Sequence, residues 1–144
     1  MTNTNYKTIA SKIKFEGRAF INGKYVDAID GKKFETINPA TGETLCSVAK
    51  CNSKDVDLAV KVSRKAFNSG VWSRTSPEFR KDILLKFAEL LRVHGVENSV
   101  LECIDTGKLI GDCINEVAND APMHFQWYGE LIDKVFGKVG PTEP

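Results

Sequence analysis

The hydrophobic pattern of this 144-residue chain changes once, close to Cys51, and this change limits the folds open to the chain more than any other feature. Before Cys51, short β-prone segments alternate with turn residues. After Cys51, apolar residues recur at the three- and four-residue spacing of amphipathic helices. The pattern predicts an α+β chain, in which antiparallel β arms are followed by a layer of helices.

The β arms are expected at residues 18–50, after an N-terminal segment at 1–17 in which residues 5–15 have the spacing of a short helix. Asn22 and Gly23 stand between two β-prone runs and tolerate the positive φ angles of a type I′ turn. A second pair of strands, Lys33–Ile37 and Thr44–Val48, flanks a turn that contains Asn, Pro and Gly.

Helices are expected over residues 52–137. Asn52 or Ser53 can cap the first of them and Gly70 can end it. The next helix starts near residue 75, bends at Gly95 and continues to residue 107. The last spans residues 109–136, and Pro122 inside it should bend or divide it, because proline removes a backbone hydrogen bond. No repeat or long linker divides the chain into domains.

The net charge excludes some partners. Twenty Lys and Arg residues stand against nineteen Asp and Glu residues, which gives a net charge of +1 and no field to attract a polyanion. We therefore expect neither nucleic acid nor a membrane as a partner. No apolar run reaches the roughly 18 to 20 residues needed to span a bilayer, and we expect a cytoplasmic protein.

Motifs that cradle phosphate groups are absent from the sequence. The eleven glycines form neither G-x-G-x-x-G nor G-x-x-x-x-G-K-[ST]. No cofactor-binding residue is therefore assigned in this chain.

No residues are grouped as a catalytic or zinc site either. The two histidines, His94 and His124, lie thirty residues apart on different expected helices. The cysteines have neither C-x-x-C spacing nor an evident activating base, so we expect four reduced, mostly buried thiols; they are Cys46, Cys51, Cys103 and Cys113. No catalytic residue is assigned.

Three aromatic residues, Trp72, Trp127 and Tyr128, are expected in the core at helix ends, because basic residues do not interleave with them as in a nucleic-acid platform. From the residues alone, the chain is a domain of β hairpins and a helical layer without a visible active site.

Several segments, however, follow one known family in the same order and at nearly the same spacing. The chain resembles the aldehyde dehydrogenases at Phe20–Tyr25, Ile37–Glu43, Asp55–Val60 with Ala66 and Phe67, Trp72, Glu102 with Asp105–Lys108, and Trp127–Tyr128. The segment Ile132–Val139 and the extension before Phe20 are most similar to the branch that acts on γ-glutamyl-γ-aminobutyraldehyde and related amino-aldehydes.

The resemblance implies the α/β fold of that family, with residues 1–144 as the N-terminal part of an NAD(P)-binding domain. In that family a cysteine attacks the aldehyde, the resulting thiohemiacetal transfers hydride to NAD(P)+, and hydrolysis releases the carboxylic acid. The catalytic and remaining cofactor-binding parts lie beyond the matched region. We therefore expect a fragment that is inactive alone and binds no cofactor by itself, whose partners are the rest of the dehydrogenase chain or homologous subunits. The small aldehyde and NAD or NADP would belong to the full-length protein.

The resemblance also implies a possible metal site. Some members of the family bind sodium or potassium through main-chain oxygens before the Asn-Pro turn and through an acid in the Asp-Thr-Gly-Lys segment. The matching residues are Thr36, Ile37 and Asp105. A helix cap and an ordinary turn are the alternative interpretation of these positions. Leu109 departs from the family, which usually has Pro there, so the helix boundary at this point could shift.

Two alternatives remain beside an inactive fragment. The chain could be a non-catalytic interaction module or truncated relic that pairs with a full-length homologue. It could also be an enzyme of another class, although no motif in the sequence supports this. The apolar faces of the helices discriminate between the first two hypotheses: faces covered within the chain favour a self-sufficient module, and bare faces favour a fragment.

Overall fold

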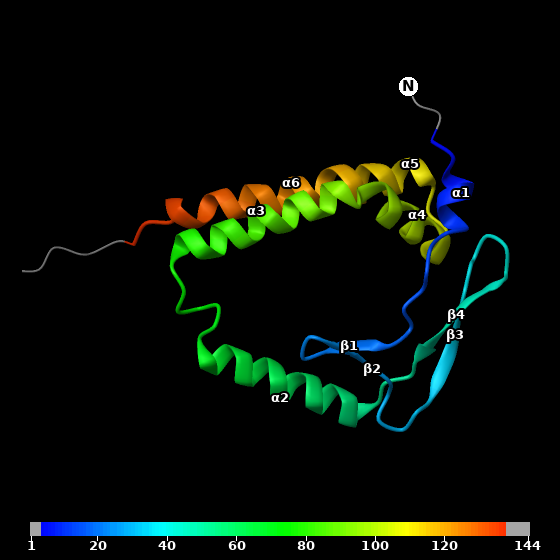
Figure 1. Ribbon diagram of the computed structural model, residues 1–144, viewed down its shortest axis with the longest axis horizontal. Helices are drawn as coiled ribbons and strands as arrows, with labels where there is room; N and C mark the ends of the chain where they lie inside the picture. The colour runs from blue at the N-terminus through cyan, green and yellow to red at the C-terminus, as the bar shows by residue number, and fades with distance from the viewer. Residues whose placement is uncertain (1–3, 138–144) are drawn as a thin grey trace, which may run out of the picture.

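The computed structural model describes residues 4–137 and confirms the predicted architecture of antiparallel β pairs followed by helices (Figure 1). The predicted N-terminal segment 1–17 and the segment Ile132–Val139 extend in part beyond the described residues. The strands are β1 (Ala19–Ile21), β2 (Lys24–Val26), β3 (Lys33–Ile37) and β4 (Thr44–Ala49). The α-helices are α1 (Tyr6–Ala10), α2 (Ser53–Ser69), α3 (Pro77–Val93), α4 (Gly95–Thr106), α5 (Ile110–Cys113) and α6 (Ala121–Leu131).

The helices do not form one continuous layer. Figure 1 shows α3 and α6 side by side as a long pair, with α4, α5 and α1 at one end. Helix α2 lies apart from this pair in Figure 1. The hairpin of β1 and β2 lies next to it, where Ile21 and Val26 border the same hollow as Leu58 and Val62.

Both strand pairs form two-stranded antiparallel sheets. The first has the predicted turn, because Asn22 and Gly23 adopt φ angles of 55° and 75°. The N-terminal segment runs along β4, where Gly17 accepts a hydrogen bond from the Ala49 amide at 2.7 Å. A Cβ atom on Gly17 would lie 2.1 Å from the Ser47 carbonyl oxygen, so only glycine allows this approach.

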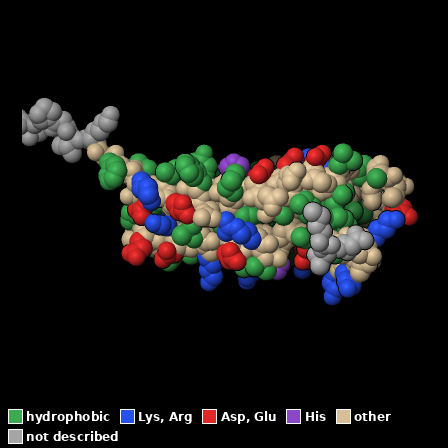
Figure 2. Space-filling view, turned by 90° about the horizontal axis from the view of Figure 1, so that it is seen from above, with side chains coloured by type: hydrophobic (Ala, Val, Ile, Leu, Met, Phe, Trp, Pro, Cys, Tyr) green, Lys and Arg blue, Asp and Glu red, His purple; other side chains and the backbone are tan. Residues whose placement is uncertain are grey.

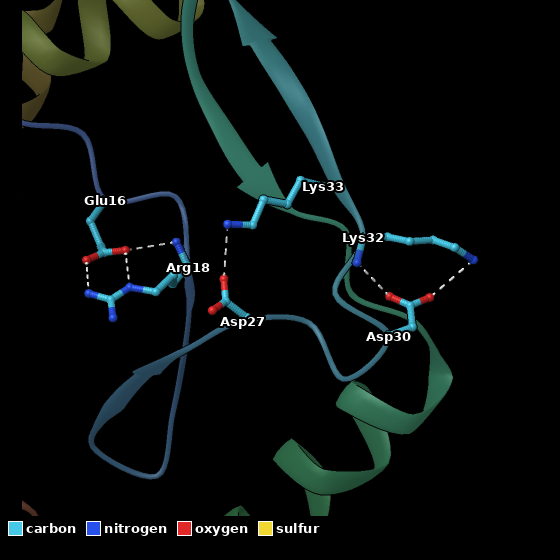
Figure 3. A network of polar contacts seen from close by, with 6 residues as sticks. All are labelled: Glu16, Arg18, Asp27, Asp30, Lys32 and Lys33. Atoms are coloured by element: carbon cyan, nitrogen blue, oxygen red, sulfur yellow. Dashed lines mark hydrogen bonds and ion pairs between the residues drawn. The ribbon is translucent and has the colours of Figure 1, made fainter.

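One charged pair joins the two hairpins, and another lies within the chain just before β1 (Figure 3). Lys33 on β3 pairs with Asp27, which follows β2, at 3.2 Å. Arg18 hydrogen-bonds with Glu16 just before β1 and lowers the pKa of that carboxyl to about 2. These groups are exposed to water, so each pair adds little stability and mainly orders the local chain.

Helix α2 is joined to the β arms through the buried side chain of Asp55 in its first turn. Asn52 and Asp55 form a capping box, which confirms Asn52 as the cap, and Gly70 ends the helix in a left-handed conformation as predicted. The carboxylate of Asp55 is only 2% exposed and accepts hydrogen bonds from the amides of Asn52 and Ile29, both at 2.8 Å. One side chain therefore caps the helix and fixes the loop after β2.

The predicted bend at Gly95 is confirmed. Helix α3 ends at Val93, His94 follows, and α4 begins at Gly95. A Cβ atom on Gly95 would lie 2.9 Å from the Ala118 Cβ, so glycine lets the next helical segment pack closely here.

The prediction at Pro122 left open a bent or a divided helix, and the structure excludes the division. The chain is not divided there: a π-helical segment, Ile114–Asp120, connects α5 to α6. The Ala121 amide donates to the Glu116 carbonyl, five residues earlier. Because Pro122 has no amide hydrogen and would clash with the carbonyl four residues back, a widened turn before it keeps the helix continuous.

Two predicted helix lengths were too long. Helix α1 spans Tyr6–Ala10 rather than residues 5–15, and α6 ends at Leu131, followed by a 3₁₀ turn over Ile132–Lys134 rather than a helix to residue 136. Apolar spacing alone extended both predictions past the last residues with helical hydrogen bonds.

The core is small, and many large apolar side chains are exposed. Ala88, Val100 and Cys113 are buried. Between α3 and α6, the rings of Phe87 and Phe125 pack edge to face, with 4.7 Å between the ring centroids. The prediction of three core aromatics was wrong, since Trp72, Trp127 and Tyr128 are 44%, 61% and 62% exposed. Figure 2, which views the α3–α6 side from above, shows apolar side chains at the surface among charged ones. Within residues 4–137, no helix is long and apolar enough to cross a bilayer.

We predict that Asp55→Ala opens the loop after β2. The Ile29 amide would lose its acceptor, and a hydrogen bond to a charged group contributes about 1.5 to 3 kcal/mol, so its hydrogen exchange should become roughly 10- to 100-fold faster. NMR-detected exchange measures this rate, and Asp57→Ala, which changes an exposed acid on the same helix, is the control. Equal protection of Ile29 in both variants would contradict the assigned role.

A second prediction concerns the ion pair between α3 and the 3₁₀ turn. Lys81 lies 2.7 Å from Asp133 and, together with Lys134, lowers the pKa of Asp133 to about 2. Because this pKa lies below the ordinary value near 4, the pair stabilises the folded chain at neutral pH, and its contribution is lost as the pH falls through about 4 toward 2.

An NMR titration of the Asp133 carboxyl tests this sign. Lys81→Met should raise the Asp133 midpoint, whereas Lys86→Met, which changes an exposed lysine on the same helix, should leave it in place. A midpoint near 4 in the unmodified chain would show that the pair does not form in solution.

Candidate functional site

Two of the three residues of the predicted cation site come together in the fold. Thr36 lies on β3 and Asp105 lies near the end of α4, sixty-nine positions apart, and the Thr36 hydroxyl donates a hydrogen bond to the Asp105 carboxylate at 3.1 Å. The contact connects the β arms to the helices. That these groups bind a cation stays a prediction.

Ile37, the third predicted residue, follows Thr36 at the end of β3, where the ladder is irregular. Thr36 is opposite Cys46, but Ile37 is opposite Thr44, so β4 has one extra residue at this point. The Ile37 side chain is exposed. Its proposed contribution is a main-chain oxygen, which such a bulge can turn away from the strand pairing.

A tight turn holds this end of β3 against α4. The Asn38 carboxamide oxygen accepts from the Ala40 amide at 2.9 Å, and the Asn38 carbonyl accepts from the Gly42 amide at 2.8 Å. Pro39 then packs on Gly107, the residue that ends α4 with a φ of 76°. A Cβ atom on Gly107 would lie 2.8 Å from Pro39, so glycine serves both the helix end and the contact.

The Asp105–Lys108 segment is also fixed from its other side. The Lys108 ammonium lies 2.5 Å from Glu116 and 3.7 Å from Glu102, and these acids raise the pKa of Lys108, Glu116 contributing most. Glu102, which by spacing alone looks like part of a solvated helix face, therefore belongs to a small ion cluster that joins α4 to the π-helical segment.

The Thr36–Asp105 contact lies in an open groove of about 490 Å³ between the N-terminal segment, the β3–β4 pair and α4. Its lining side chains are Lys14, Phe15, Glu16, Phe34, Thr36, Cys46, Val48, Leu101 and Asp105. Sequence reasoning missed Cys46 and the Lys14–Glu16 stretch. The pairing of Cys46 with Thr36 depends on the bulge, and nothing in the local pattern places residues 14–16 beside α4.

The donor set limits the chemistry of this groove. Its oxygen donors are the Asp105 carboxylate, the Glu16 carboxylate that is paired with Arg18, the Thr36 hydroxyl and main-chain oxygens, which suit a hard cation of low charge. Within residues 4–137, no group of three or more His, Cys, Asp or Glu side chains gathers as a metal site. The described residues thus form at most part of a coordination shell.

The cysteines are all free thiols, as expected, but they are less buried than predicted. Cys113 is fully buried and Cys51 is exposed, while the other two are intermediate. Burial raises the pKa of Cys113, which makes its thiolate scarcer and its sulfur a weaker nucleophile at neutral pH.

Both histidines lie at the surface, outside the groove. One ring nitrogen of His124, Nδ1, lies 2.8 Å from the Asp120 carbonyl of the preceding helical turn, and His94 lies 3.9 Å from Glu97. These are local helix contacts.

Comparison with known proteins agrees with the resemblance drawn from the segments. The sequence model of the aldehyde dehydrogenase family matches residues 25–144. Aminoacetaldehyde dehydrogenase of Pseudomonas aeruginosa is 40% identical over 142 residues, which cover 99% of this chain and 29% of that protein. The NADP/NAD-dependent aldehyde dehydrogenase PuuC of Escherichia coli is 40% identical over 92% of this chain and 27% of its own length.

The fold agrees with solved structures. The crystal structure of γ-glutamyl-γ-aminobutyraldehyde dehydrogenase from Burkholderia cenocepacia superposes with a TM-score of 0.91 and 41% identity, over 96% of this chain and 28% of that one. The chain spans less than a third of the length of these relatives. The matched region and these identities show that the chain belongs to the aldehyde dehydrogenase family.

Proposed function

We propose that this chain forms the N-terminal part of the cofactor-binding domain of an NAD(P)+-dependent aldehyde dehydrogenase and is inactive without the remaining parts. The observation that carries the proposal is the bare apolar surface of the helices. Phe67 and Trp127 are each more than 60% exposed, although fully burying such a side chain contributes about 1.5 to 3 kcal/mol. A self-sufficient module would cover these faces.

The N-termini of α2 and α3, helices of 17 residues each, do not suit a dinucleotide. A phosphate binds at a helix N-terminus through free amides and the positive end of the dipole. At α2, the side chains of Asn52 and Asp55 already accept hydrogen bonds from backbone amides of the helix N-terminus, and the negative charge of Asp55 would repel a phosphate. At α3, Ser76 accepts from the Phe79 amide and Glu78 adds a negative charge. We therefore assign cofactor binding and hydride transfer to residues outside this chain.

For the whole protein, amino-aldehydes are the proposed substrate class. The support is the naming of two relatives, one for aminoacetaldehyde and one for γ-glutamyl-γ-aminobutyraldehyde, at 40% and 41% identity. Both compounds carry the aldehyde on a chain with a nitrogen group.

A chimera tests the function. Residues 1–144 replace the matching segment of PuuC, and the chimera should oxidise amino-aldehydes with NAD+ or NADP+, because its helices and turns would present the same packing surfaces. The free chain should show no rate above a protein-free blank. Turnover by the free chain would contradict its inactivity, and a folded but inactive chimera would contradict its place in the dehydrogenase.

We also propose that Thr36, Ile37 and Asp105 supply part of a monovalent cation site whose remaining ligands come from outside this chain. The support is the 3.1 Å contact between Thr36 and Asp105 beside the bulge at Ile37. A cation that binds only the folded state stabilises it by about 1 kcal/mol at five times its Kd.

This site is tested by the melting temperature of the active chimera in sodium, potassium and choline chloride at equal ionic strength. Asp105→Asn should abolish the difference between the metal ions and choline, whereas Asp112→Asn, at an exposed acid, should preserve it. The salt-dependent difference is the readout, because loss of the Thr36 hydrogen bond lowers stability in every salt. An unchanged difference in Asp105→Asn would refute the cation role.

A further inference from the structure

Two of the four cysteines stand on either side of one tight turn. Residues 107–109 alone join α4 to α5. Cys103 stands five positions before Lys108, and Cys113 stands five positions after it. Figure 1 shows α4 and α5 as neighbours, in agreement with their contacts. The two thiols therefore belong to the two arms of one helical hairpin.

The arms of this hairpin are antiparallel. At its far end, Gly95 begins α4 and faces Ala118 of the π-helical segment, where a Cβ atom on the glycine would lie 2.9 Å from the alanine Cβ. At its near end, the Cys103 thiol donates a hydrogen bond to the Lys108 carbonyl at 3.1 Å. Because the first residue of α4 meets a late residue of the following segment, the last turns of α4 pass beside α5, which contains Cys113.

One face of α4 carries both ends of this contact. Gly95, Ser99 and Cys103 recur at four-residue spacing, which places them on the same side of a helix. Ser99 lies between the other two and is fully buried, and its hydroxyl donates to the Gly95 carbonyl at 2.7 Å. The buried stripe that begins against Ala118 therefore extends toward Cys103.

Cys113 lies on the facing arm, and its side chain is fully buried. Burial raises the pKa of the Cys113 thiol most, and the charge of Cys103 raises it next. Weaker effects come from Glu102, Lys108 and Glu116. A charge on Cys103 can act on Cys113 in this way only if the two sulfur groups are near neighbours. The charge effect and the register of the hairpin thus place the same two thiols together.

We propose that Cys103 and Cys113 form a redox-sensitive pair, in which a peroxide oxidises Cys103 and Cys113 then closes a disulfide with it. Neither residue belongs to the candidate cation site, and the pair does not depend on the proposed function.

The reaction takes two steps. The Cys103 sulfur, which is only half-buried, attacks the O–O bond of the peroxide. One peroxide oxygen stays on the sulfur as a sulfenic acid, and the other leaves with the thiol proton as water or an alcohol. The Cys113 sulfur then displaces the sulfenic hydroxyl group, which leaves with the Cys113 proton as water. The two thiols lose two electrons in total, and the peroxide gains them.

The second step is favoured by position rather than by reactivity. The raised pKa of Cys113 makes its thiolate scarce at neutral pH. The reaction is intramolecular, however, between groups held on packed helices, and such placement strongly accelerates a reaction. A buried thiol that reacts poorly with dissolved oxidants can therefore still react with its neighbour.

The disulfide would close residues 103–113 into a ring next to the β arms. This ring contains Asp105, which accepts a hydrogen bond from Thr36, and Gly107, which packs on Pro39. A cross-link reduces the number of conformations open to the chain between its ends. Oxidation would thus tighten the contact between the β arms and the helices.

The test treats the chain of residues 1–144 with a small molar excess of hydrogen peroxide, blocks the remaining thiols and digests the protein with trypsin without reductant. Lysine or arginine separates each cysteine from the next, so trypsin places the four cysteines in different peptides. Cys103 lies in the peptide of residues 93–108, and Cys113 lies in that of residues 109–134. Mass spectrometry should find these two peptides joined, two hydrogen atoms lighter than their sum, and dithiothreitol should separate them.

Three variants identify the pair. Cys103→Ser and Cys113→Ala should each abolish the joined peptides, and in Cys113→Ala the Cys103 sulfenic acid should persist and be trapped by dimedone. Cys51→Ser, which removes an exposed thiol outside the hairpin, should leave the yield of joined peptides within about twofold. If the buried substitution unfolds its variant, the peptide map of the unmodified chain still decides the question.

A map in which Cys103 is joined to Cys46 or Cys51, or is recovered as a thiol or sulfinic acid while Cys113 stays free, would overturn the pair. Hydrogen exchange tests the tightening. The Gly107 amide donates to the Cys103 carbonyl at 3.0 Å and should exchange at least about threefold more slowly in the oxidised chain. Equal or faster exchange would overturn the tightening. None of these readouts uses dehydrogenase activity, so this proposal and the proposed function can fail separately.

Discussion

The arrangement of this chain depends on one tertiary joint, where the turn after β3 meets the end of α4. Thr36 donates to Asp105 at this joint, and Pro39 packs on Gly107 beside it. The N-terminal segment adds a second connection, because Phe15 and Val48 line the same groove as Leu101 of α4. Because the joint combines a side-chain hydrogen bond with a position that only glycine can fill, its geometry tolerates little change. The same joint places the oxygen atoms of the candidate cation site.

The local secondary structure and the core of this chain differ in how far the chain itself completes them. Many local interactions are formed within this chain: α2 has its capping box, α2 and α4 end at glycines with positive φ, and the first hairpin has the turn that Asn22 and Gly23 predict. The core is not complete, because few large side chains are buried and aromatic residues of α2 and α6 face water. Secondary structure is thus specified within the chain. Much of the burial that would stabilise it requires apolar surface from outside the chain.

This difference explains what the sequence could predict. Turns, caps and helix breaks depend on one or two residues at fixed offsets, so Asn22, Asn52, Gly70 and Gly95 were interpreted correctly. The burial of Trp72 and Trp127 was not, because an apolar pattern identifies a face that needs covering but not the chain that covers it. The π-helical segment was also missed, since proline predicts a lost hydrogen bond but not how neighbouring turns compensate. For the candidate site, the family resemblance selected Thr36 and Asp105, and their spacing of sixty-nine residues gave no sign that they meet.

The combination of formed secondary structure and a small core limits the net stability of this chain. Its helices have enough local stabilisation to hold their shape, but a net stability of only about 5 to 15 kcal/mol for typical domains leaves little reserve when many apolar side chains stay in water. Covering the exposed apolar faces of α2 and α6 would therefore contribute to folding and to assembly at the same time, because the same contacts serve both. In this chain the free energy of folding and the free energy of binding cannot be assigned to separate sets of residues, so a substitution on either of these faces acts on both.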